Sequence, residues 1–371
     1  MGNIHIKSIN IETYRGIKNL NLEGFTGINI FTGDNNSGKT SVLEVLQTVG
    51  NPGSPKSWSQ LGRTEKYPNP SQTVFESIKN LYSVAESEMR IAYKKVDDKN
   101  GGSSVVLKGS LNKKKVLKKD YCLEAHIDCR DEELFSESEL LELHTDIIYN
   151  ENPIEEFDVS NVTRFDVFAE NIEKPYKEYN TVYVSPSVYN ESFSDKTILI
   201  LKENENQEEF LSILRIFDED ILDLVPTSRE YDIPFPLKNS YQIRSKSMGK
   251  LLPLNVFGDG LKKVIQLATA IFYAKNGILL IDEFETAIHT SAMTKIYGWI
   301  LKTCKKLNVQ LFLTTHSKEA LQKVLELNSD SELKDDITLY TLYKKNGKNI
   351  ARRLSAERAI EADQNFNQEL R

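Results

Sequence analysis

Residues 33–40 have the sequence GDNNSGKT, which matches the pattern GxxxxGK followed by Ser or Thr. The segment comes directly after an apolar run at 28–31, which we predict to be a strand. It comes directly before residues 40–49, whose apolar side chains recur at helical spacing. A glycine-rich turn between a strand and a helix lets backbone N–H groups wrap phosphates at the positive end of the helix. We therefore expect a phosphate-binding P-loop.

Lys39 and Thr40 supply the side-chain chemistry of this turn. Lys39 is expected to reach the two terminal phosphates, and the Thr40 hydroxyl is expected to ligate Mg²⁺. The expected ligands are therefore a nucleoside triphosphate and Mg²⁺. The other residues assigned to the phosphate site are Gly33, Asn35, Asn36, Ser37, Gly38 and Ser41.

A second motif consists of four strand-like residues and two acids, ILLIDE at 278–283. Asp282 is expected to hold Mg²⁺, and Glu283 to polarise the attacking water. His316 follows the next predicted strand, 34 residues after Asp282. Because ligands bind at the carboxyl ends of strands in an α/β sheet, His316 should meet the same site and donate to the γ-phosphate.

The segment 257–260, with the sequence FGDG, opens a helix predicted at 264–274. Gly258, Asp259 and Gly260 resemble a second phosphate cradle that has no lysine of its own. One chain cannot readily place two cradles on one γ-phosphate, so this turn is expected to face the nucleotide of a second subunit. The alternative is a plain helix start with Asp259 as its cap.

Taken in this order, the motifs resemble an ABC-type ATPase head. The resemblance points to the soluble branch related to RecF, SMC and OLD-family proteins, the AAA-type predicted ATPases. Further similarity lies in YRG at 14–16, VYVSPS at 182–187 and the closing ELR at 369–371. The turn reads FGDG where transporters have LSGGQ, and His289 stands where transporter heads have Asp. We could not assign a Q-loop glutamine.

The resemblance implies a P-loop α/β head, with a mixed sheet flanked by helices, formed by residues 1–50 and 181–371. It leaves residues 51–180 unmatched, and we predict there a mixed α/β insertion that acts as a lid or a partner-binding region. It also implies ATP and Mg²⁺ as ligands, and a homodimer or higher oligomer closed through the ATP sites.

Composition sets the broad class. The 371 residues include 47 Lys and Arg against 54 Asp and Glu, a net charge of −7. This balance is typical of a globular chain and disfavours a protein that coats nucleic acid non-specifically, although it is compatible with a local basic patch. No apolar run approaches the roughly 18 residues of a membrane span, and the first residues lack the pattern of a signal peptide. The three cysteines are too few for a disulfide framework. A cytoplasmic location is expected.

Within the insertion, we predict a helix at 73–83, strands at 103–108 and 121–129, and an acidic helix at 134–144. A long amphipathic helix is predicted at 208–224. The spacing of Cys122, His126 and Cys129 could suggest zinc, but two faces of one strand would separate the cysteines. The lysine-rich segment 113–119 is either a solvated loop or a contact to nucleic acid. His5 and His144 give no functional signal.

The leading hypothesis is an ATPase that dimerises around ATP and drives or licenses a partner. The resemblance implies that this partner acts on nucleic acid, such as a nuclease, in DNA repair or anti-phage defence. The 55 residues after His316 are fewer than the roughly 100 of an appended nuclease domain, so a nuclease is expected on another chain. The alternatives are a nucleotide-sensing scaffold with little hydrolysis, or a transporter ATPase subunit, for which the LSGGQ motif and the Q-loop are missing. A small-molecule kinase would not need the turn at 258–260 or His316.

Overall fold

The computed structural model describes residues 3–61, 74–82, 88–97, 101–125, 136–163, 178–186, 197, 200–201, 204–227, 240–287 and 293–366. Six strands form the sheet that carries the P-loop, in the order β15-β14-β3-β13-β12-β8. Four of its five neighbouring pairs are parallel, and the edge pair β14–β15 is antiparallel. These strands are β3 (Ile28–Gly33), β8 (Thr181–Val184), β12 (Ile278–Ile281), β13 (Gln310–Thr314), β14 (Ile337–Lys345) and β15 (Lys348–Ser355).

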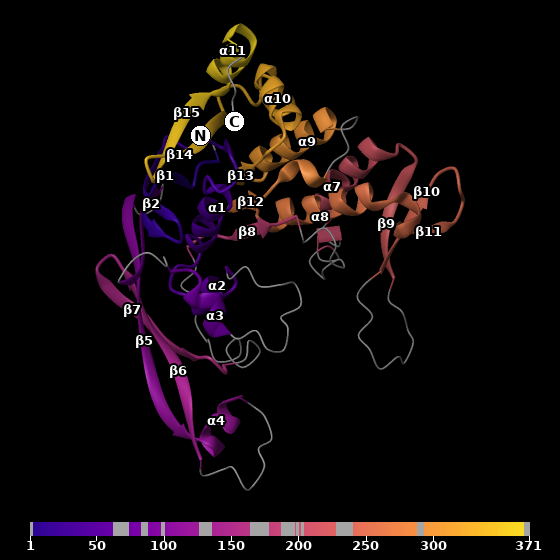
Figure 1. Cartoon of the computed structure of the whole chain (residues 1–371). Coiled ribbons are helices and arrows are strands. Elements are labelled where there is room, and N and C mark those ends of the chain that lie inside the picture. The colour runs from indigo at the N-terminus through magenta and orange to yellow at the C-terminus, as the bar shows by residue number, and fades with distance from the viewer. Residues whose placement is uncertain are drawn as a thin grey trace.

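Every residue of β3, β12 and β13 is buried, because both faces of this sheet are covered. Alternate residues of β12 enter two different cores. Leu279 and Ile281 pack with α8 (Asp259–Tyr273), α9 (Met293–Lys306) and α10 (Lys318–Glu326), whereas Ile278 and Leu280 pack with α1 (Lys39–Thr48) and the N-terminal strands. The sheet is therefore a buried layer between helices (Figure 1).

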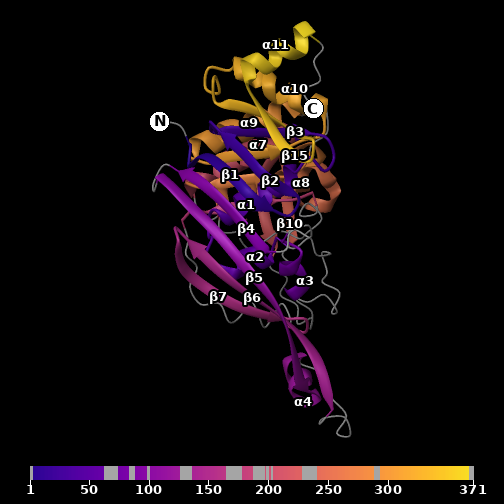
Figure 2. The same ribbon diagram turned by 60° about the vertical axis from the view of Figure 1, so that its left-hand side comes forward.

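A second six-stranded sheet is antiparallel throughout, in the order β2-β1-β4-β5-β6-β7. Its strands are β1 (Ile6–Tyr14), β2 (Ile17–Glu23), β4 (Met89–Asp97), β5 (Gly101–Leu117), β6 (Glu137–Tyr149) and β7 (Asn152–Ser160). β4 pairs directly with β1, so the N-terminal strands and those of the predicted insertion share one sheet. The paired strands β5 and β6 extend well beyond the rest of this sheet, with α4 (Lys118–Ala125) at their far end (Figures 1 and 2).

The remaining elements are shorter or peripheral. A three-stranded sheet has the order β11-β10-β9 and lies beside the segment before α8. Its strands are β9 (Ile221–Thr227), β10 (Ser240–Ser245) and β11 (Leu251–Pro253). The other helices are α2 (Pro55–Ser59), α3 (Val74–Lys79), α7 (Asn204–Phe217), α11 (Ala356–Phe366), and the 3-10 turns η3 (Leu254–Phe257), η4 (Phe284–Ala287) and η6 (Leu327–Ser329).

The mixed α/β fold, with a sheet flanked by helices, confirms the predicted fold class. The boundaries 1–50, 51–180 and 181–371 stay a prediction. Three local predictions are wrong. The acidic segment at 134–144 belongs to strand β6 from Glu137 onward, residues 121–125 belong to α4 and not to a strand, and the helix predicted at 208–224 ends at Phe217 before β9 begins.

The β6 error has a clear physical cause. The glutamates of 137–142 favour a helix locally, but β6 pairs with β5 at thirteen consecutive positions, from Glu137 opposite Leu117 to Tyr149 opposite Val105. Among the described residues, no helix is both long enough and apolar enough to cross a membrane.

Candidate functional site

The P-loop joins β3 to α1 through glycines in the left-handed region. Gly33 has φ 136° and Gly38, the cap of α1, has φ 105°. A Cβ atom at Gly33 would lie 2.0 Å from the Leu342 carbonyl oxygen, so only glycine fits between β3 and β14 here. The sequence motif thus predicts where the turn lies, and the neighbouring strand β14 restricts the position of Gly33 to glycine.

Lys39 is buried and its charge points into the turn. Its Nζ donates to the carbonyl oxygens of Gly33 (2.8 Å) and Asp34 (2.9 Å). Burial lowers the Lys39 pKa, and the negative charges of Asp282, Asp34, Glu283 and Glu285 oppose that shift. The Ser37 hydroxyl in the same turn is buried without a hydrogen-bond partner. A phosphate chain would satisfy both groups, since it offers the lysine an anion and the hydroxyl an acceptor.

Asp282 lies at the end of β12 and its carboxylate has three protein donors. Oδ1 accepts from Thr40 Oγ1 (3.4 Å) and from Thr314 Oγ1 (2.5 Å), and Oδ2 accepts from the Tyr183 hydroxyl (3.2 Å). The two predicted metal ligands, Thr40 and Asp282, are therefore in contact. Mg²⁺ prefers oxygen ligands such as hydroxyl and carboxylate oxygens, so these two residues fit that ion.

Glu283 is the first residue after Asp282 and has φ 49°, which is unusual for a residue with a side chain. Its backbone N–H donates to Thr314 Oγ1 (2.8 Å). The single hydroxyl of Thr314 thus holds both acidic residues of the motif. Sequence reasoning missed Thr314 and Tyr183, although both stand at or near the carboxyl ends of sheet strands.

His316 follows β13 and is held by an acidic residue that the sequence did not single out. Its backbone N–H donates to Glu285 Oε1 (2.8 Å), which connects the η4 turn to the end of β13. The second carboxylate oxygen of Glu285, Oε2, is buried without a partner. Glu285 therefore holds the segment that carries His316 in place.

A cleft of about 740 Å³ opens over the P-loop. The residues that line it are Arg15, Gly16, Ile17, Asn35, Asn36, Gly38, Lys39, Thr40, Ser41, His316, Lys344 and Asn349. Arg15, Lys39 and Lys344 bring positive charge to this lining, and none of the described residues that line it carries a carboxylate. Lys344 and Asn349 come from the hairpin of β14 and β15, and sequence reasoning missed both. This distribution of charge suits a polyphosphate.

Arg15 is fixed at the edge of the cleft. Its Nε lies 3.1 Å from Glu44 Oε2, and a terminal guanidinium nitrogen donates to the Leu61 carbonyl oxygen (2.7 Å). The Tyr14 hydroxyl donates to the same oxygen of Glu44 (3.1 Å). Glu44 lies on α1, so the turn between β1 and β2 and the P-loop helix are connected through one carboxylate.

Gly258, Asp259 and Gly260 do not line this cleft. Gly258 has φ 82° and caps α8, and a Cβ atom there would meet nothing within 4 Å. The Asp259 side chain is 85% exposed and pairs with Lys262 (3.0 Å). A Cβ atom at Gly260, by contrast, would lie 3.0 Å from Cζ of Phe217. The predicted second cradle is therefore a solvent-facing turn on its own chain.

The weaker sequence signals have mixed outcomes. Cys122 is disulfide-bonded, which removes it as a zinc ligand and departs from the expected reduced thiols. His126, Cys129, His289 and the closing segment 369–371 lie outside the described residues. In the lysine-rich segment, Lys114 pairs with Glu142 and Lys115 with Glu137 (2.9 Å), so part of its charge is neutralised.

Comparisons with known proteins extend these observations. Residues 28–321 match the family described as "AAA domain, putative AbiEii toxin, Type IV TA system". A protein of Helicobacter pylori named ATP/GTP phosphatase is 26% identical over 365 residues, covering 91% of this chain and 92% of that protein. An uncharacterised protein of Methanocaldococcus jannaschii is 41% identical over 69 residues, covering 19% of this chain and 60% of that protein.

Similar solved structures include two SMC heads. The SMC head bound to the C-winged helix domain of ScpA is 14% identical, with a TM-score of 0.49, and the match covers 96% of this chain and 99% of that one. The SMC head domain from Thermotoga maritima is 13% identical, with a TM-score of 0.43, and the match covers 95% of this chain and 99% of that one.

Proposed function

Because the chain belongs to the AAA-domain family that its residues 28–321 match, we propose that it hydrolyses ATP in a Mg²⁺-dependent reaction. One observation carries this proposal. Among the described residues, the cleft over the P-loop is lined by three cationic side chains and no carboxylate, while Asp282 contacts Thr40 beside it. The Helicobacter relative named as an ATP/GTP phosphatase supports a nucleotide substrate.

Each predicted residue has a defined task in this proposal. Lys39 exchanges its bonds to the Gly33 and Asp34 carbonyl oxygens for bonds to phosphate oxygens. Mg²⁺, when bound, neutralises charge on the phosphates, and Thr40 and Asp282 would hold it. Glu283 accepts a proton from the attacking water as that oxygen bonds to the γ-phosphorus and the bond to ADP breaks. His316 donates to the γ-phosphate.

We further propose that two copies close around ATP through the turn at 258–260. The turn starts a 15-residue helix, so its free N–H groups suit an anion, yet it lies outside its own chain's cleft. The surface before it exposes apolar side chains: Val256 is 65% exposed and Leu251 is 38% exposed. Burying these against a second copy would favour association, and only the γ-phosphate would bridge both surfaces.

The family description mentions a toxin of a toxin–antitoxin system, which supports a proposed role in defence. We propose that ATP-driven closure licenses a partner that acts on nucleic acid, such as a nuclease on another chain, in DNA repair or anti-phage defence. The strands β5 and β6 and helix α4 offer such a partner a surface far from the cleft (Figure 2). Whether Lys113 and its neighbours contact nucleic acid stays a prediction.

The test is phosphate release from ATP by the purified full-length chain with Mg²⁺. Glu283→Gln should bind ATP like the wild type and turn over at least ~10²-fold more slowly. Lys39→Ala should lose nucleotide binding, because it removes the buried charge that faces the phosphates. Glu326→Gln, the same change at the exposed end of α10, is the control and should be fully active. Wild-type binding of ATP without turnover would reject the hydrolase and favour a nucleotide-sensing scaffold.

A further inference from the structure

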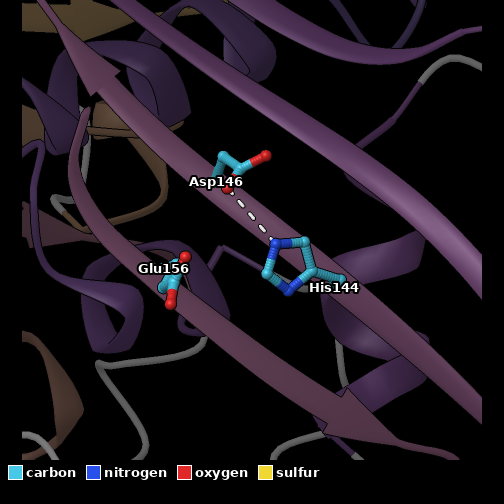
Figure 3. A group of neighbouring side chains, drawn as sticks. All are labelled: His144, Asp146 and Glu156. Atoms are coloured by element: carbon cyan, nitrogen blue, oxygen red, sulfur yellow. Dashed lines mark hydrogen bonds and ion pairs between the residues drawn. The ribbon is translucent and has the colours of Figure 1, made fainter. Parts of the chain in front are cut away.

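A group of ionisable side chains lies on one face where β6 pairs with the edge strand β7, in the part of the chain that the nucleotide site does not use. His144 stands opposite Asp158, and Asp146 stands opposite Glu156. Because side chains two residues apart in a strand share a face, all four project to the same side of this strand pair. Figure 3 shows His144, Asp146 and Glu156.

The imidazole of His144 is held by carboxylates on both of its nitrogens. Nδ1 lies 2.9 Å from Asp158 Oδ1, and Nε2 lies 3.2 Å from Asp146 Oδ1. One ligand atom from each of His144, Asp146 and Glu156 falls within 4.8 Å of the others. A metal-binding histidine is commonly oriented by a carboxylate that is hydrogen-bonded to one ring nitrogen, while the other ring nitrogen faces the metal and its further ligands.

The charges of this group are unbalanced. Asp146 and Glu156 are directly opposite each other, and like charges in that position destabilise a strand pair. Lys108 stands opposite Asp146 on β5, yet it makes no ion pair with it. In the part of the chain that the structure describes, His144 is the one cationic group that contacts these carboxylates, and it is cationic only when protonated. A bound cation would remove the repulsion at any pH.

We propose that His144, Asp146 and Glu156 bind a divalent transition-metal ion, with Zn²⁺ as the test ion and water completing the site. Bonds of about 2.0–2.1 Å place two ligands of a tetrahedral Zn²⁺ about 3.3 Å apart, which agrees with the 3.2 Å between His144 Nε2 and Asp146 Oδ1. One imidazole with two carboxylates favours Zn²⁺ over Mg²⁺ or Ca²⁺, which take oxygen ligands. The ion would tie β7 to β6.

Proton competition gives this site a pH dependence. A hydrogen bond that the imidazole donates to Asp158 raises the pKa of His144 above its ordinary value, and the charges of Asp158 and Asp146 add to the effect. Burial of the ring opposes this shift. Metal binding must displace the Nε2 proton, so Zn²⁺ affinity falls at acid pH.

The experiment is calorimetric titration of the full-length chain with Zn²⁺ at pH 7.5, with Mg²⁺ in excess to occupy the P-loop oxygens. We expect one Zn²⁺ per chain from this group, and at least a tenfold loss of affinity in His144→Ala and in Glu156→Gln. Asp158→Asn should cost less than either, because Asp158 orients the ring without ligating. Bound Co²⁺ should give a visible absorption band that His144→Ala lacks.

Glu155→Gln is the matched control. It makes the same charge change one residue away, opposite Ile147 and thus off the face that carries His144. Its Zn²⁺ affinity should equal that of the wild type. Undiminished Zn²⁺ binding by His144→Ala, or an equal loss in Glu155→Gln, would overturn the proposal. All these positions are at least partly exposed, so thermal unfolding should show every variant folded.

Discussion

Replacing Thr314 by valine tests whether one hydroxyl organises the acidic motif. The side chain is fully buried at the end of β13, and its Oγ1 accepts from the Glu283 N–H and donates to Asp282 Oδ1. Valine keeps the shape and the strand preference but removes both bonds. Glu283 then loses a contact that supports its left-handed backbone conformation.

Two losses lower the free energy of unfolding of this variant. A hydrogen bond to an ionised group contributes about 1.5–3 kcal/mol, and a buried N–H left without a partner costs about 1–3 kcal/mol. We expect the free energy of unfolding to fall by about 3 kcal/mol. If Glu283 also leaves its working position, a transition-state loss of about 2.7 kcal/mol would lower kcat about 10²-fold.

The assay pairs denaturant unfolding with ATP turnover at saturating Mg²⁺. Thr338→Val is the control, because Thr338 is equally buried in the same central sheet but lies at the start of β14, where its hydroxyl contacts Thr26. It should lose about 1 kcal/mol of stability and no activity. Wild-type kcat in Thr314→Val would refute the reasoning, since the acidic motif would then not depend on this hydroxyl.

Two further predictions concern residues around the cleft. Glu285→Ala should lower kcat about tenfold at unchanged KM, because the backbone N–H of His316 loses its acceptor. Glu285→Gln should retain most of the activity, because its amide oxygen can still accept that hydrogen bond. Equal kcat in both variants and the wild type would contradict this positioning role. Asp259→Arg changes an exposed residue and so avoids the crowded position of Gly260; it should keep ATP affinity and lose hydrolysis. Mixing it with Lys39→Ala should restore part of the activity, because heterodimers of the two variants contain one intact site. Full activity of Asp259→Arg alone would reject a shared site.

Much of the central sheet could be predicted because its signals are local. The strand at 278–281 and the helix at 40–49 follow from an apolar run and from helical spacing, and the structure confirms both within one residue at each end. Thr40 and Asp282, 242 positions apart in the sequence, were assigned to one metal and are in contact. Parallel strands that end at one edge explain why these motifs converge.

The site residues that the sequence did not predict depend on the pairing of segments that are distant in the sequence. Lys344 and Asn349 reach the cleft because β14 pairs with β3, and no local pattern marks either residue. Glu285 stands two residues after the acidic motif at 278–283, but its role is visible only once the end of β13 lies beside the η4 turn. His144 gave no signal, since its neighbours on β7 are set by strand register.

The pairing of β4 with β1 has an evolutionary consequence. Excising residues 51–180 would leave β1 with an open edge beside the turn that carries Arg15, so this part of the chain cannot be lost as a module. The far half of β5 and β6 is free of that constraint, because beyond Ser110 and His144 the two strands pair mainly with each other. Adding or deleting matched residue pairs there would change the reach of the hairpin by roughly 3.4 Å per pair and leave the nucleotide cleft unaltered. This geometry would allow relatives to differ in hairpin length while they keep the same cleft over the P-loop.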